Sequence, residues 1–133
     1  MSFTHTINKV FNSDSGASFI GSVASTGGME VNVDEAIPAL STDLLVAFAA
    51  DVSQVKSLFI LATGAMTIET NDGSSPGNTI TLAANIPFVW TSQDGLDLRD
   101  TAEAAVTVDI TSIYVTSTAG GSLKIRALID PTV

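Results

Sequence analysis

The stretch AVTVDITSIYVTSTAGGSLKIRALID, residues 105–130, constrains the fold of this chain more than any other. Apolar and polar residues alternate on both sides of a Gly-Gly pair, which predicts two β-strands joined by a tight turn. The apolar phase nevertheless changes along the first strand, because Val108 and Ile110 fall on one face while Ile113 and Val115 fall on the other. A hairpin made from this stretch would therefore present apolar side chains on both of its faces.

Two explanations of the second apolar face stay open at this point. If Val115 pairs with Leu123, a β-bulge near Thr111–Ser112 would shift the phase and return all the apolar side chains to one core. Alternatively, another subunit covers the part of the hairpin that is distant from the turn, as partners often cover exposed apolar patches. That part carries Val108, Ile110 and Leu128.

The rest of the chain is also typical of short strands separated by Gly, Asn and Asp. Further strands are expected near residues 3–11, 17–25, 29–34, 57–63, 65–71, 79–84 and 86–92. Residues 41–56 are ambiguous, and we favour a strand that places Leu44, Val46 and Phe48 on one face, followed by one helical turn. The polar stretch 71–78 indicates a hairpin loop.

These elements predict an all-β fold, an antiparallel β-sandwich of jelly-roll type with about eight to ten short strands. The length of 133 residues suits a single domain, 1–133, in which residues 1–12 form an N-terminal arm or an edge strand.

The charge balance disfavours several classes of partner. Fourteen acidic residues against five basic ones give a net charge of −9, which repels nucleic acid and anionic membrane surfaces. No cysteine is present, so disulfides, thiolate metal sites and cysteine nucleophiles are excluded. The N-terminus has no evident secretion signal, and the longest apolar run, 44–50, is too short to span a bilayer.

Catalytic and metal-binding signals are weak. His5 is the single histidine, and we interpret it as a strand or arm residue because no spacing supports a catalytic triad around it; a metal on an oligomer axis is the alternative. Asp94, Asp97 and Asp100 crowd one loop and would suit Ca²⁺, but they lack EF-hand spacing and Arg99 lies among them. A solvated acidic loop is favoured over a calcium site or a hydrolase centre. We predict no catalytic residue, metal or cofactor.

Aromatic and basic residues supply candidates for contact surfaces. Trp90 and Tyr114 would stack on a sugar in a carbohydrate-binding module, although a lone Trp is more often a core or interface anchor. Lys124 and Arg126 share one strand face, which is an ordinary solvent face or a cationic patch for an acidic partner.

From residue 51 onward the chain resembles small structural proteins of tailed-phage virions. The resemblance rests on VKSLFILATGAMTIETN, then a Ser/Pro/Gly loop, then ITLAANIPFVW and finally ITSIYVTSTAGGSLKIRALIDPT. It implies a β-sandwich, often trimeric, that decorates or cements a capsid shell; small tail and adaptor proteins share this architecture. The implied partners are further copies of the chain and the major capsid protein, in a virion assembled in the bacterial cytoplasm.

With this resemblance, we expect another subunit to cover the second face of the hairpin and the N-terminal arm to reach a neighbour. A carbohydrate- or receptor-binding module is the alternative function. The positions expected at contact surfaces are Phe3, His5, Phe11, Trp90, Val108, Ile110, Tyr114, Lys124, Arg126 and Leu128.

Overall fold

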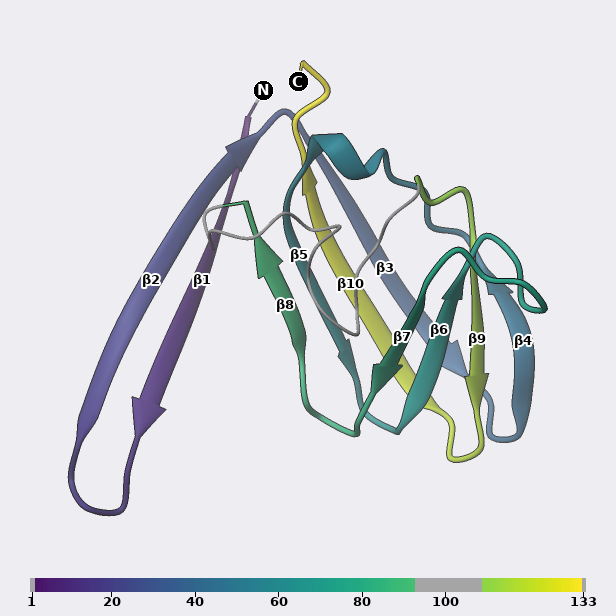
Figure 1. Cartoon of the computed structure of the whole chain (residues 1–133), viewed down its shortest axis with the longest axis horizontal. Coiled ribbons are helices and arrows are strands. Elements are labelled where there is room, and N and C mark those ends of the chain that lie inside the picture. Colours follow the sequence, from purple (N-terminus) through teal and green to yellow (C-terminus); the bar gives the residue numbers. More distant parts are fainter. Residues whose placement is uncertain (1, 93–108, 133) are drawn as a thin grey trace.

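The computed structural model describes residues 2–92 and 109–132, and it has an all-β architecture (Figure 1). A single 3-10 turn, η1 (Val52–Gln54), interrupts the strands. The strands are β1 (Phe3–Asn12), β2 (Ser18–Gly27), β3 (Met29–Ile37), β4 (Ser41–Val46), β5 (Val55–Ala62), β6 (Met66–Thr70), β7 (Thr79–Leu82), β8 (Phe88–Thr91), β9 (Ile113–Ser117) and β10 (Gly121–Ile129). Among these described residues, no helix has the length and hydropathy to cross a membrane.

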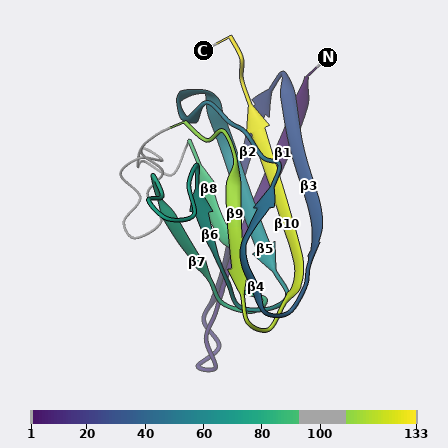
Figure 2. The ribbon, with the colours of Figure 1, turned by 90° about the vertical axis from the view of Figure 1, so that its right-hand side faces the viewer.

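Eight of the strands form two four-stranded antiparallel sheets, in the orders β3-β10-β5-β8 and β4-β9-β6-β7. Figure 2 shows the two sheets as facing layers. The strands pair as a nested series, β3 with β10, β4 with β9, β5 with β8 and β6 with β7. This nesting is the jelly-roll arrangement, so the predicted antiparallel sandwich is confirmed.

The core lies between the two sheets and is built from facing apolar rows. One row crosses the first sheet through Val33, Ile125, Ile60 and Phe88. The other crosses the second sheet through Leu44, Val115, Ile68 and Ile80. Because side chains alternate between the faces of a strand, each row requires the period-two pattern that the sequence displays.

The predicted hairpin over residues 105–130 is wrong. β9 and β10 belong to different sheets, so the chain between them crosses from one layer to the other at Gly120, whose φ is +71°. The apolar phase changes between Ile110 and Ile113 because Ile110 precedes β9 and forms an isolated bridge to Ala50, and both side chains are nevertheless buried in the same core. No bulge at 111–112 is needed, because those residues precede β9.

The other segments follow the predictions more closely. β6 and β7 form the expected hairpin around the polar loop, and the helical turn lies inside the expected range. Val46 and Phe48 are buried in the core and Leu44 is partly buried against the same core cluster, as the strand interpretation of residues 41–56 required. Phe48 itself lies just beyond the end of β4.

The remaining two strands, β1 and β2, form a separate antiparallel hairpin. We call it the N-terminal hairpin. Its base lies against β5 and β10, whereas its far end runs away from the sandwich (Figure 1). The expected N-terminal arm is therefore a two-stranded ribbon that extends to Gly27, well beyond residue 12.

Candidate functional site

The base of the N-terminal hairpin is fixed to the outer face of the β3-β10-β5-β8 sheet. There Glu30, Leu128 and Ser57 occupy adjacent positions on β3, β10 and β5, and we call these three residues the anchor row. His5 of β1 bridges the row, with 2.6 Å between its Nε2 and Glu30 Oε2 and 3.0 Å between its Nδ1 and Ser57 Oγ. The imidazole therefore spans the strand that carries Leu128.

The bonding pattern assigns a role to each imidazole nitrogen. A carboxylate only accepts hydrogen bonds, so His5 Nε2–H donates to Glu30. In the neutral ring Nδ1 then accepts from the hydroxyl of Ser57. Both nitrogens are occupied inside the chain, and His5 has neither of them available for a metal on an oligomer axis.

Close backbone contact completes the anchor. Leu128 is 0% exposed although it points away from the sandwich core, because the hairpin covers it. A Cβ on Gly27 would lie 2.6 Å from the carbonyl oxygen of Ile129 and 3.1 Å from Leu128 Cγ, so only glycine allows this approach. Ile7, also buried, adds apolar contact area from β1.

This burial corrects the prediction that another subunit covers the second apolar face. The chain's own hairpin covers Leu128, and Ile110 is buried in the core, where it bridges to Ala50. Val108 lies outside the described residues. Two of the three apolar residues that indicated an oligomer, Ile110 and Leu128, are thus buried within a single chain.

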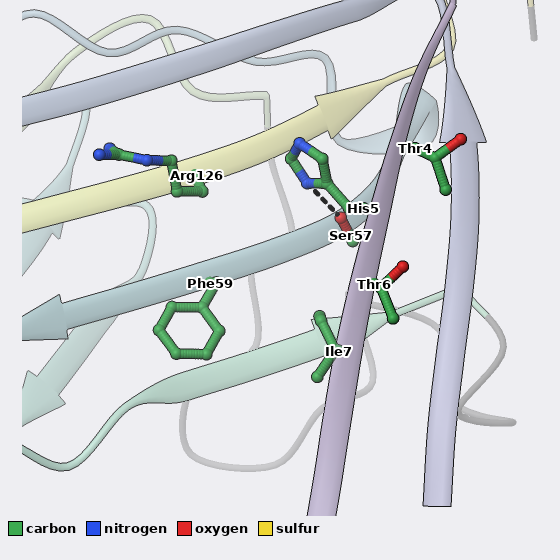
Figure 3. A pocket seen from close by; sticks show the side chains of 7 residues that line it. All are labelled: Thr4, His5, Thr6, Ile7, Ser57, Phe59 and Arg126. Atoms are coloured by element: carbon green, nitrogen blue, oxygen red, sulfur yellow. Dashed lines mark hydrogen bonds between the residues drawn. The ribbon is translucent and has the colours of Figure 1, made fainter.

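A cleft of about 300 Å³ lies beside the anchor, between β1 and the sheet (Figure 3). Its lining residues are Thr4, His5, Thr6, Ile7, Ser57, Phe59 and Arg126. Arg126 is held at the rim by two hydrogen bonds to the Asp34 carboxylate, at 2.9 and 3.1 Å, and by a third to the carbonyl of Val33. The expected cationic patch is therefore partly neutralised by its own chain.

The Ser57–His5–Glu30 chain has the bonding order of a hydrolase triad but lacks the rest of the machinery. Ser57 is 1% exposed, so its hydroxyl does not face the solvent as a nucleophile must. At Ser57, β5 pairs with β10 on one side and with β8 on the other. The backbone N–H groups of β5 are therefore used within the sheet. No donor pair remains there to stabilise an oxyanion. The three residues act as a clamp.

The far half of the hairpin has the opposite character. Val10, Phe11, Phe19 and Ile20 are 56%, 49%, 66% and 68% exposed. The rings of Phe11 and Phe19 stack across the two strands with centroids 4.9 Å apart, and Val10 pairs with Ile20 on the other face. We call Phe11 and Phe19 the Phe face. Sequence reasoning found Phe11 and missed Phe19, although pairing across the turn at residues 13–17 would have placed them opposite each other.

The other predicted contact residues are dispersed. Trp90 is buried in the core, so its ring offers no stacking surface for a sugar. Phe3 is half-buried at the hairpin base, Tyr114 is half-buried on the outer face of β9, and Lys124 is exposed on β10. The acidic loop with Asp94, Asp97 and Asp100 lies outside the described residues, within which no group of three acidic or histidine side chains suits a metal.

Removing the clamp will loosen the hairpin base. We expect His5→Ala to lower the free energy of unfolding by about 1–3 kcal/mol, because both partners of the imidazole lose a hydrogen bond in a partly buried site. Hydrogen exchange will also accelerate in β1 and β2 more than in β5 or β10. The control is Thr26→Ala, an exposed position on the same hairpin. Equal exchange in the two variants would contradict the clamp.

A second cluster of charge lies on the opposite sheet, where Glu69 of β6 is near Asp43 and Asp72. Desolvation, followed by the charge of Asp43, raises the pKa of Glu69 above its ordinary value. An acid with a raised pKa in the folded state destabilises the fold when it is ionised. Stability is therefore lost as the pH rises through the ordinary pKa of glutamate toward the raised one.

We expect Glu69→Gln to be more stable than the wild type at neutral pH, by less than about 1 kcal/mol because solvent screens the group. Below about pH 3, where the carboxyl is protonated in both states, the difference will vanish. Thermal unfolding at both pH values measures this effect. Glu35→Gln, an exposed carboxylate on β3, is the control and will show no such gain.

No protein family, curated protein sequence or solved structure matches this chain.

Proposed function

We propose that this chain is a non-enzymatic structural protein of a tailed-phage virion, a capsid decoration or cement protein that associates with its own copies and with the shell of the major capsid protein. One observation carries the proposal. A small jelly roll fixes the base of a two-stranded ribbon with a buried clamp and leaves two apolar pairs of the far half open to solvent. Such a patch is typical of an assembly contact.

The chemistry of the described residues supports a role in binding over a role in catalysis. The one triad-like chain is buried and structural, and Arg126 is engaged by Asp34. The alternative of a carbohydrate-binding module depended mainly on Trp90, whose ring lies in the core. A net charge of −9 would keep the protein off packaged DNA, which suits a position on the outside of the shell.

The choice of the virion rests on the sequence resemblance from residue 51 onward. The segments that carry it are β5 to β8 and β9 to β10, which make up most of the jelly roll. Localisation at the capsid surface, after assembly in the bacterial cytoplasm, belongs to the same proposal.

Quantitative mass spectrometry of virions purified from the host's phage tests this function. We expect the chain at hundreds of copies per particle, in a fixed ratio to the major capsid protein. A handful of copies would indicate a tail or adaptor protein instead. Complete absence from virions would refute the proposal, whatever the oligomeric state of the purified protein.

A further inference from the structure

The Phe face continues a face of the hairpin that is already buried at its base. Along β1, His5 and Ile7 point to the sheet, and the period-two alternation puts Phe11 on the same side. Register then adds Phe19 from β2. The far half of the hairpin diverges from the sheet that covers its base (Figure 1), and both rings are exposed to solvent.

The opposite face of the tip is better suited to water. Val10 and Ile20 lie there between two polar pairs, Asn8 with Ser22 and Asn12 with Ser18. Each pair is joined by a hydrogen bond, of 2.6 Å and 2.8 Å respectively. The aromatic pair on the inner face is therefore the larger apolar surface that lacks a cover.

An isolated two-stranded ribbon is marginally stable in water, so a cover for the Phe face is needed for the tip to hold its shape. The distribution of net charge along the chain indicates which partner can cover the Phe face. In residues 1–28 Lys9 and Asp14 cancel, so residues 29–133 carry the whole net charge of −9. Two bodies of this charge repel each other, whereas two hairpins of zero net charge do not.

We infer that the Phe face of one copy packs against the Phe face of a second copy, so that the hairpin is the arm through which copies of this chain associate. The same patch serves on both sides, as in a twofold contact. The projecting arms meet while the acidic bodies stay apart, where salt screens them. The inference deepens the proposed function and rests on it only in treating the hairpin as an assembly element.

Sedimentation velocity of the purified full chain over a range of concentrations tests this contact. We expect the wild type to associate at tens of micromolar. The double variant Phe11→Ser/Phe19→Ser will raise the dissociation constant by about 100-fold or more, because the contact loses its central aromatic residues. The matched control Val10→Ser/Ile20→Ser removes similar exposed apolar area from the outer face and will associate nearly as the wild type does.

Circular dichroism and thermal unfolding of each variant will establish that the jelly roll is intact, which is expected because all four side chains lie outside the core. A wild type that stays monomeric at these concentrations would overturn the inference. So would an association that survives loss of the Phe face, or one that only the outer-face variant abolishes. Phe-face variants that associate normally but no longer bind capsid shells would make the shell the occupant, which overturns the inference and leaves the proposed function standing.

Discussion

Replacing Gly64 by alanine will lower the free energy of unfolding by about 3 kcal/mol or more, the largest loss that we expect from a single added methyl group. A Cβ on Gly64 would lie only 1.9 Å from the carbonyl oxygen of Gly120, a backbone atom that has no rotamer to change. Gly120 in turn packs against the backbone of Ala39 and Ile37. The β3–β4, β5–β6 and β9–β10 connections, each of which joins the two sheets, therefore meet at one end of the sandwich. At least one of them must move to relieve the clash.

Urea denaturation of Gly64→Ala beside Gly21→Ala measures this loss. Gly21 is a suitable control because a Cβ there would meet no atom within 4 Å, and its φ is not in the left-handed region. Alanine at Gly21 will be neutral or slightly stabilising. Similar stabilities for the two variants would mean that the connections at this end of the jelly roll are not packed as described.

Leu128→Ala will lower the free energy of unfolding by about 2–5 kcal/mol, the range for a buried leucine. Leu128 is 0% exposed between the hairpin and the outer face of β10, so its loss leaves a cavity under the His5 bridge. Hydrogen exchange will rise most in β1 and β2, because this side chain holds the hairpin rather than the two sheets.

Leu45→Ala is the matched control, since the same atoms are removed from β4 at a position that is 61% exposed. Its cost will stay within about 0.5 kcal/mol. If both variants lose the same stability, or if exchange in Leu128→Ala rises evenly over the whole chain, the hairpin does not depend on the anchor row.

The fold class was predictable from the sequence because alternation along a strand is a local property. Val31 and Val33 of β3 display it, as do the strands over 57–63 and 79–84. The partner of a strand is not local. The pattern of residues 113–129 is equally compatible with a hairpin and with two strands on opposite sheets, and only the nested pairing of all eight strands decides between them.

The candidate site was only half predictable, for a similar reason. His5 and Phe11 were identified because a lone histidine and an aromatic residue in an N-terminal strand are visible in the sequence. Glu30 and Ser57 are ordinary surface-type residues in their own strands, and they gain a role only when register aligns β3, β10 and β5 beneath β1. Leu128 shows most clearly what the sequence alone could not predict. Its position on the outer face indicated that a second subunit covers it, whereas the N-terminal hairpin of the same chain does so.

The anchor and the tip give the N-terminal hairpin two separate roles. The clamp of His5 with Glu30 and Ser57 fixes where the ribbon leaves the sandwich, and the Phe face lies where the ribbon has left it. Loss of the clamp is therefore expected to weaken association indirectly, because the arm would be held in many orientations and ordering it would cost entropy.

Cysteine cross-linking of this chain, which has no native cysteine, is a direct test of association through the Phe face. Gly21→Cys adds a thiol on the Phe-face side, where a Cβ has open space, and Ser22→Cys adds one on the outer face of the next residue. Two ribbons packed face to face lie about 10 Å apart, within the span of a short bismaleimide reagent. We expect rapid formation of cross-linked dimers for Gly21→Cys and few dimers for Ser22→Cys. Equal yields, or a higher yield at Ser22, would contradict association through the Phe face.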